Sequence, residues 1–216
     1  MINKIKEYFQ SEKGKADVKE WVDTIVFVVI AVIIIRFFFG EIRWIPSGSM
    51  HPTLLEGDRI VVERMTRFYK APERGDVMVF YPPFVELKHN PWALFSRLTG
   101  FFCKDVAFIK RVIGLPNEKF EIKQATDGSY AVYINDEKLE EPYIVSKYDF
   151  TPCSDPRVNC GPFIIPEDEY LMLGDNRGAS YDGRFWGTLP RKNFIGKAVV
   201  LFWPVNRIKL MKNPQS

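Results

Sequence analysis

The sequence predicts a mainly β protein, in which an antiparallel β-sheet ectodomain with a hairpin insert follows one N-terminal transmembrane helix. Two observations support this fold class. One long apolar run lies near the N-terminus, over residues 21–39. Beyond residue 43 the apolar residues fall in short runs rich in β-branched and aromatic side chains, each bounded by Gly, Pro, Asp or Asn. With 216 residues, the chain is long enough for one well-buried domain after the apolar run is set aside.

The apolar run, WVDTIVFVVIAVIIIRFFF, is long enough for a membrane anchor, which we place at residues 21–40. As a helix the run would extend roughly 28 Å, close to the thickness of a bilayer core. Asp23 and Arg36 lie near its ends, where charged groups reach the lipid headgroups. The alternative, a cleavable signal peptide, is disfavoured because no small-x-small cleavage site follows the run.

The charges around this anchor predict its orientation. Residues 1–20 are polar and contain five lysines, whereas Arg36 and Arg43 lie at the far end of the run. Basic residues favour the cytoplasmic side of a membrane. We therefore expect a single-pass protein with residues 1–20 in the cytoplasm and residues 41–216 outside it.

The composition excludes several classes of function. The balance of 30 Lys+Arg against 27 Asp+Glu gives a net charge of only +3, so nucleic acid is not an expected partner. Two histidines and three cysteines, with no CxxC or HExxH spacing, leave little from which to build a zinc site. We expect neither a metal nor a cofactor.

The short apolar runs are read as strands. They cover residues 58–65, 75–82, 105–115, 169–174 and 197–204. Residues 119–139 are predicted to form a hairpin that turns at Asp127-Gly128, with a second turn near Asn135-Asp136. The region from about 120 to 165 is accordingly expected to be an inserted hairpin subdomain.

Two further segments leave alternatives open. Cys153 and Cys160 lie in a Pro/Gly-rich loop, TPCSDPRVNCG, where they form either a disulfide or two free thiols. Residues 84–104 contain Trp92 and Phe95 and are too apolar for an ordinary surface loop. This segment either packs on the core or dips into the membrane.

Candidate chemistry begins with a serine-containing loop. The segment IPSGSMHPTLLEGD, residues 45–58, places Ser47 and Ser49 on either side of a glycine, which lets a ligand approach the backbone closely. The segment is not the G-x-S-x-G nucleophile elbow of an α/β-hydrolase. Taken alone, such a loop is most often a solvated turn. His51 is a poor candidate for the base because it lies only two residues from Ser49 along the same chain.

Two other polar segments accompany this loop. In AFIKRVIGLP, residues 107–116, Lys110 and Arg111 interrupt an apolar strand, so one of them points toward an apolar surface. A lysine there either pairs with a carboxylate or is desolvated, with a pKa low enough for it to act as a base. The segment GDNRGASYDGRFWG, residues 174–187, is a dense polar loop that is either solvated or scaffolds an active site.

In this order after an N-terminal anchor, the three segments resemble bacterial type I signal peptidase (leader peptidase), a Ser-Lys dyad serine protease family. The motifs are PSGSMxPTL followed by GD, then KRVIGLP, then GDNR…S.D.R.WG. The resemblance implies a membrane-bound endopeptidase that removes signal peptides from exported preproteins, cleaving after small residues at −1 and −3. It also implies a bacterial inner membrane location, with a periplasmic catalytic domain. The implied partners are signal-peptide-bearing preproteins and the lipid bilayer, and the expected state is a monomer.

The resemblance assigns a role to each matching residue. Ser49 would be the nucleophile, Lys110 its general base, and the Ser47 hydroxyl with the Ser49 N–H group the oxyanion hole. The supporting residues would be Ser180, which orients the Lys110 amine, and the pairs Asp182–Arg184 and Asp175–Arg111. Substrate contacts would come from Ile45, Pro46 and Met50.

This sequence departs from the family pattern in places. Gly178, Ala179 and Gly183 replace polar residues that are usual there, and Asn117 replaces a glycine, although Asn also adopts a left-handed turn. A non-catalytic anchored β domain is disfavoured, because such a domain should have lost at least one of four polar residues, and all four are present: Ser47, Ser49, Lys110 and Ser180. A self-cleaving, repressor-type Ser-Lys protease is disfavoured by the anchor, and an organellar relative of the same family remains open.

Overall fold

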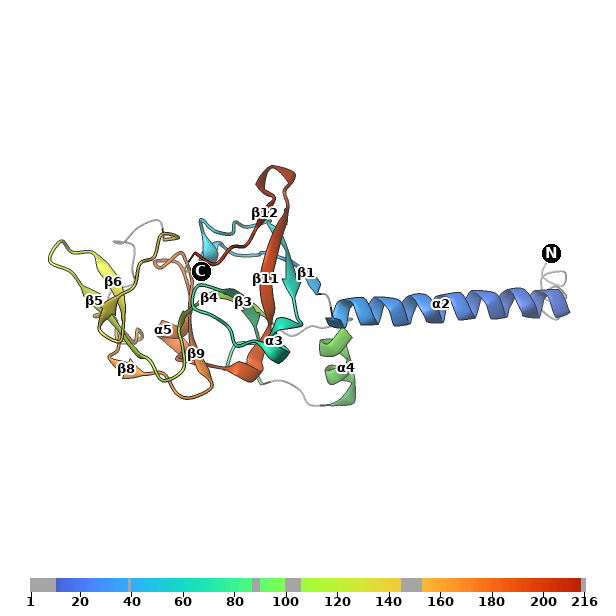
Figure 1. Ribbon diagram of the computed structural model, residues 1–216, viewed down its shortest axis with the longest axis horizontal. Helices are drawn as coiled ribbons and strands as arrows, with labels where there is room; N and C mark the ends of the chain where they lie inside the picture. The colour runs from blue at the N-terminus through green and yellow to red at the C-terminus, as the bar shows by residue number, and fades with distance from the viewer. Residues whose placement is uncertain (1–10, 39, 87–89, 100–105, 145–152, 215–216) are drawn as a thin grey trace.

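The computed structural model describes residues 11–38, 40–86, 90–99, 106–144 and 153–214. One long helix, α2 (Glu12–Phe38), projects from a body made mainly of strands (Figure 1). Within the described part of the chain, no helix is both long and apolar enough to cross a membrane. The expected anchor at 21–40 falls partly on residues 36–39, whose side chains lie outside those described.

The main sheet is antiparallel, with the order β1-β2-β11-β3-β4-β9-β10 and with β12 paired to β11. Its strands are β1 (Glu41–Trp44), β2 (Arg59–Glu63), β3 (Val77–Phe80), β4 (Phe108–Gly114), β9 (Glu169–Leu173), β10 (Leu189–Pro190), β11 (Phe194–Trp203) and β12 (Lys209–Leu210). The predicted antiparallel, mainly β class is confirmed. β4, which carries Lys110 and Arg111, lies between β3 and β9.

A second antiparallel sheet has the order β7-β6-β5-β8. Its strands are β5 (Lys119–Gln124), β6 (Tyr130–Ile134), β7 (Glu137–Lys138) and β8 (Phe163–Ile164). The predicted hairpin is confirmed, because β5 pairs with β6 and Gly128 takes a positive φ of 81° at the first turn. Asn135 and Asp136, at φ 51° and 69°, form the second turn, as two-residue hairpin turns require.

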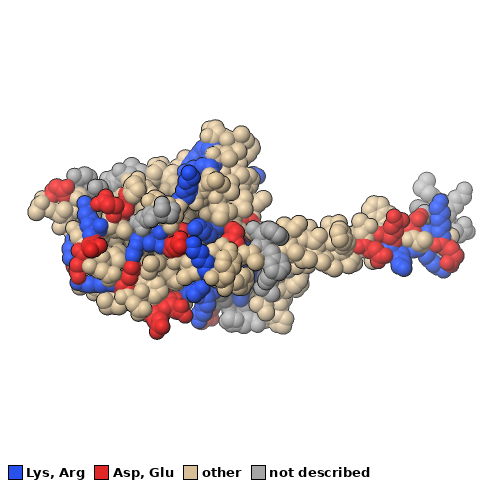
Figure 2. All heavy atoms as spheres, viewed as in Figure 1, with Lys and Arg blue, Asp and Glu red and all other residues tan. Residues whose placement is uncertain are grey.

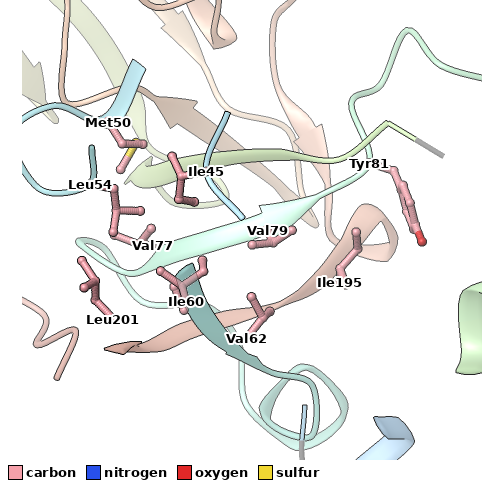
Figure 3. Close-up of a cluster of buried hydrophobic side chains, with 11 residues drawn as sticks. Ile45, Met50, Leu54, Ile60, Val62, Val77, Val79, Tyr81, Ile195 and Leu201 are labelled. Carbon is pink, nitrogen blue, oxygen red and sulfur yellow. The ribbon is translucent and has the colours of Figure 1, made fainter. Parts of the chain in front are cut away.

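Buried side chains of the described residues form apolar clusters that join these elements. One cluster packs on strands β2, β3 and β11 of the main sheet. It includes Ile45, Met50, Leu54, Ile60, Val62, Val77, Val79, Tyr81, Ile195, Ala198 and Leu201 (Figure 3). The second contains Ile113 and Leu171 of the main sheet together with Phe120 and Val132 of the second sheet. The two sheets therefore share one continuous apolar contact.

The remaining helices are short. The one-turn helices are α3 (Thr66–Tyr69) and α5 (Gly183–Trp186), and the 3-10 turns are η1 (Gly48–Met50), η2 (Arg191–Asn193) and η3 (Val205–Arg207). The segment 84–104 contains a helix that the sequence pattern did not predict, α4 (Pro91–Thr99). Asn90 caps it, since the Asn90 Oδ1 atom accepts the Ala93 N–H at 2.7 Å. Cys153 and Cys160 are joined by a disulfide.

Candidate active site

Ser49 and Lys110 are brought together by a turn and a strand that lie far apart in the sequence. Ser49 lies in η1, and its neighbour Met50 is fully buried in the core, which holds the turn against the sheet. Lys110 lies in the middle of β4. Alternation along β4 turns Lys110 and Arg111 to opposite sides, as the sequence predicts, and both are buried.

The Lys110 Nζ atom lies 2.7 Å from the Ser49 Oγ atom and 3.0 Å from the Ile109 carbonyl oxygen. Lys110 is 4% exposed and Ser49 is 7% exposed. Burial lowers the pKa of Lys110 to about 8, although the Asp182 and Asp175 carboxylates act in the opposite direction. An amine in this setting loses its proton far more readily than a lysine in water.

A second hydroxyl lies beside the pair. The Ser47 Oγ atom is 3.4 Å from the Ser49 Oγ atom. His51 follows η1 and is exposed, so the buried Lys110 amine rather than the imidazole lies against the Ser49 hydroxyl. Among the residues that the structure describes, no group of three or more His, Cys, Asp and Glu side chains is placed to hold a metal ion.

The polar loop after β9 holds the Ser49 turn through Asn176. Its backbone N–H donates to the Ser49 carbonyl at 3.1 Å, and its Nδ2 donates to the Gly48 carbonyl at 3.1 Å. These bonds leave the Ser49 side chain free to face Lys110. Asn176 belongs to the dense polar loop and to its GDNR motif, but neither pattern predicts its hydrogen bonds to the Ser49 turn.

The structure contains both expected ion pairs. The Arg111 guanidinium donates to both Asp175 carboxylate oxygens, at 2.8 and 2.6 Å, and its other nitrogen donates to the Gly75 carbonyl at 2.7 Å. The Arg184 guanidinium donates to Asp182 at 2.9 and 3.0 Å. All four side chains are almost completely buried, so each charge depends on its partner.

Asp182 also connects the Asp182–Arg184 pair to the backbone at Gly174, which lies beside Ser180. Its carboxylate accepts the Gly174 N–H at 3.0 Å. The Ser180 hydroxyl, expected to orient the Lys110 amine, is buried and has no hydrogen-bond partner among the described residues. A side chain at Gly174 would collide with it, because an added Cβ atom would lie 2.2 Å from the Ser180 Oγ atom and 2.5 Å from the Ser49 carbonyl oxygen. Gly174 therefore permits the close approach of these two segments.

The segment after β7 reaches the site through Glu141 and Tyr143, which no motif in the sequence indicates. The Glu141 carboxylate binds both terminal nitrogens of Arg177, one of them at 3.0 Å, and accepts the Tyr143 hydroxyl at 3.0 Å. The Arg177 Nε atom donates to the Gly174 carbonyl at 3.0 Å. The Arg111 guanidinium lies 4.0 Å from the centre of the Tyr143 ring. These long-range contacts have no local sequence signal.

A cleft of about 420 Å³ opens beside Ser49 and Lys110. Its remaining walls are Pro46, Ser47, Val106, Ala107, Phe108, Ile109, Ala179 and Tyr181. Of the residues expected to contact substrate, only Pro46 lines this cleft. The side chains of Ile45 and Met50 lie in the core instead and are 2% and 0% exposed.

Three of the residues that depart from the family motifs, Asn117, Gly183 and Ala179, fit their surroundings in the structure. Asn117 takes the left-handed conformation, with φ at 65°, as expected for a residue in place of glycine. Gly183 lies against β9, where an added Cβ atom would be 2.8 Å from the Leu171 Cδ1 atom, so a larger residue needs a shift there. Ala179 lines the cleft and leaves it more open than a polar side chain would.

The chain is similar to known signal peptidases over most of its length. The model of the family "Signal peptidase, peptidase S26" matches residues 18–203. The chain is 42% identical to signal peptidase I of Leptolyngbya laminosa over 94% of this chain and 89% of that protein. It is 40% identical to the probable signal peptidase I-2 of Synechocystis sp. over 87% of this chain and 74% of that protein.

Two more distant matches were also found. Thylakoidal processing peptidase 1 of Arabidopsis thaliana is 31% identical over 82% of this chain and 46% of its own length. A signal peptidase I crystal structure from Enterococcus faecalis aligns with 59% of this chain and 97% of its own at 25% identity, with a TM-score of 0.39. The assignment accordingly rests on the family model and the sequence relatives. The chain belongs to the signal peptidase family of serine peptidases, peptidase S26.

Proposed function

We propose that the chain is a membrane-bound endopeptidase that removes signal peptides from exported preproteins, with Ser49 as nucleophile and Lys110 as general base. The observation that carries this proposal is the 2.7 Å separation of the Lys110 Nζ and Ser49 Oγ atoms in a buried setting. An activated hydroxyl is the first requirement of acyl transfer, and a neutral amine at hydrogen-bond distance supplies the base.

The proton transfers follow from the contacts of Lys110. The Ile109 carbonyl accepts one N–H of the amine, and the lone pair of the neutral form accepts the Ser49 proton. The Ser49 Oγ atom then bonds to the carbonyl carbon of the scissile peptide. Lys110 passes the proton to the departing amine nitrogen, which breaks the C–N bond and leaves an acyl-enzyme. A water molecule, deprotonated by Lys110, releases the acyl group and returns the proton to Ser49.

The negative charge that develops on the carbonyl oxygen needs donors. We assign this role to the Ser47 hydroxyl and the Ser49 backbone N–H. The 3.4 Å separation of the Ser47 and Ser49 Oγ atoms supports this role. When the Ser49 Oγ atom bonds to the carbonyl carbon of the substrate, the Ser47 hydroxyl lies close to that carbon and to its negatively charged oxygen. Ser180 is assigned to positioning: its buried hydroxyl, unpaired among the described residues, is available to the amine when substrate binds.

The cleft suits an extended peptide. Pro46 and Ser47 form one wall and the start of β4 forms the other, so a substrate strand between them brings its scissile bond to Ser49. The apolar walls and modest volume favour small side chains at the −1 and −3 positions. We infer that the chain acts as a monomer, since the dyad, its ion pairs and the cleft all come from one copy.

We assign the N-terminal helix α2 to the membrane. Its apolar side chains include Trp21, Ile25, Phe27 and Ile30, each at least half exposed. Figure 2 shows an uncharged stretch of α2 between the charged residues near its N-terminal end and those of the strand-built body. We propose insertion in the inner membrane of a bacterium, with the N-terminus in the cytoplasm and the site outside.

The test is cleavage of a model preprotein in lipid vesicles by the full chain and by Ser49→Ala and Lys110→Met. Cleavage after a small-x-small sequence should be lost in both variants. The exposed residues Ser154 and Lys138 provide matched controls, because Ser154→Ala and Lys138→Met should cleave as the parent does. Cleavage by Lys110→Met would show that another group, with His51 the first candidate, is the base. A folded parent that does not cleave would contradict the proposed function.

A further inference from the structure

We propose that helix α4 (Pro91–Thr99) is a second membrane contact, which lies in the lipid headgroup region beside the anchor. This inference rests on the proposed insertion of α2, and it concerns a different surface. Residues 84–104 join β3 to β4, and both strands border the active-site region. The orientation of α4 thus affects how the cleft meets the membrane.

The apolar side chains of α4 face outward. Trp92, Leu94 and Phe95 are 62%, 54% and 42% exposed, whereas Ser96 is buried. The rings of Trp92 and Phe95 stack with their centroids 5.7 Å apart, which makes one rigid aromatic surface. A surface helix in water normally has the opposite arrangement, with its largest apolar residues against the protein. An exposed aromatic face of this kind marks a binding surface.

The protein side of α4 is anchored by a polar contact. The Arg64 guanidinium, 3% exposed, donates at 2.9 Å to the Arg97 carbonyl near the C-terminal end of the helix. Another nitrogen of Arg64 lies 3.6 Å from the Glu41 carboxylate at the start of β1. The Trp92–Phe95 face therefore has a fixed orientation relative to the sheet.

The occupant we assign is a phospholipid bilayer. In Figure 1, α4 lies beside the C-terminal end of α2 and runs across its axis. If α2 crosses a membrane, α4 then lies along the membrane surface, where tryptophan side chains concentrate. The sequence of α4 contains no acidic residue, and Arg97 lies in its last turn, so nothing in it repels anionic headgroups.

Strand β1 also carries exposed apolar side chains. Ile42 and Trp44 on this edge strand are 64% and 62% exposed. β1 follows α2 almost directly along the chain and lies at the same end of the strand-built body as α4 (Figure 1). A bilayer accommodates a surface shared by several elements, whereas a peptide ligand needs a defined groove.

The experiment measures the depth of nitroxide labels in the full chain, reconstituted in vesicles of phosphatidylethanolamine and phosphatidylglycerol. Labels are attached to Leu94→Cys, Val28→Cys and Ile164→Cys, each made with Cys103→Ser. Ile164 is the matched control, because it is 61% exposed and lies on β8, far from α2. We expect the Leu94 label to collide readily with oxygen and rarely with a water-soluble nickel complex. The Ile164 label should show the reverse.

The other outcomes separate the two proposals. A Leu94 label that is as accessible to nickel as the Ile164 label, while the Val28 label is in lipid, overturns the role of α4 and leaves the anchor intact. A Leu94 label protected from both reagents indicates packing against protein and also overturns it. A Val28 label in water instead contradicts the proposed anchor, on which this inference rests.

A second readout links α4 to substrate. Leu94→Glu should lower kcat/KM about tenfold for a preprotein inserted in vesicles, because a charge weakens the contact of α4 with the bilayer. Cleavage of a short soluble peptide in detergent should be unchanged, as should both activities of Ile164→Glu. Equal losses on both substrates would mean that the substitution damages the enzyme itself, and would contradict the membrane role.

Discussion

The Lys110 amine is held between two oxygen atoms, the Ser49 hydroxyl at 2.7 Å and the Ile109 carbonyl at 3.0 Å. The carbonyl is only an acceptor, so it orients one N–H of the amine and leaves the lone pair of the neutral form for Ser49. Protonation of Lys110 removes that lone pair. The charge state of this one residue therefore controls the proposed reaction.

We expect kcat/KM to rise with pH and to reach half its maximum near pH 8. Burial lowers the pKa of Lys110 to about 8, so the free enzyme gains its base as the pH passes through that value. Initial rates on a peptide substrate, measured from about pH 6 to about pH 10, give the profile. An activity that is constant over this range would be incompatible with Lys110 as the base.

Lys110→Met should be more stable than the parent at pH 7, by about 2–3 kcal/mol. Below pH 8 the folded chain carries a protonated lysine that burial disfavours, whereas the unfolded chain carries it without penalty. Between about pH 8 and 10.5 the unfolded chain binds a proton that the folded chain does not, so the parent gains stability and the difference shrinks. Urea unfolding at pH 7 and pH 10 tests this, with Lys138→Met as the exposed control.

Ser47→Ala should reduce kcat by about 10²- to 10³-fold, the usual effect of losing one oxyanion donor. KM should change little, since the donor acts on charge that develops after binding. Single-turnover rates with the model preprotein would separate the two parameters, and Ser154→Ala serves as the control. An unchanged kcat would exclude Ser47 from the oxyanion hole.

Gly174→Ala should strongly destabilise the fold or displace Ser49. The added methyl group would lie 2.5 Å from the Ser49 carbonyl oxygen, which belongs to the backbone and cannot rotate away. Gly48→Ala is the comparison for stability, because its Cβ atom would meet only the Glu56 Oε1 atom, at 3.5 Å. Thermal unfolding of both variants distinguishes them, and equal melting temperatures would contradict the steric argument.

Glu141→Gln should cost about 3–5 kcal/mol of stability, because it leaves the buried Arg177 charge without its carboxylate. Glu137→Gln, on exposed β7, should cost little. Chemical denaturation curves of the two variants give the comparison. Similar losses in both would mean that Arg177 is compensated elsewhere.

Much of the β structure was predictable because its signals are local. Alternating apolar residues and turn residues indicate β2, β3, β4 and the β5–β6 hairpin. The position of β11 between β2 and β3 has no such signal, since strand order depends on long-range packing. Helix α4 was missed because it is short and its large apolar residues face outward, although Asn90-Pro91 is a typical helix start.

For the site, too, the local features were predictable from the sequence and the long-range contacts were not. Ser49, Lys110 and the two ion pairs were expected because three short motifs, each contiguous in the sequence, resemble those of the signal peptidase family. The burial of the Ile45 and Met50 side chains in the core could not be predicted, because proximity to Ser49 along the chain does not tell whether a residue faces the cleft or the core. Glu141 and Tyr143 were missed because their partners lie on another segment, and only the folded chain brings them together.

The pair of Glu141 and Arg177 also limits how this chain can change over time. It joins positions 36 residues apart, one in the segment after β7 and one in the loop beside Ser49. Replacing either residue alone leaves a buried charge without its partner, so we expect the residues at positions 141 and 177 to change together in relatives of this chain. A chimera that takes its second sheet from a relative would need a matching carboxylate at 141 to retain a properly formed loop.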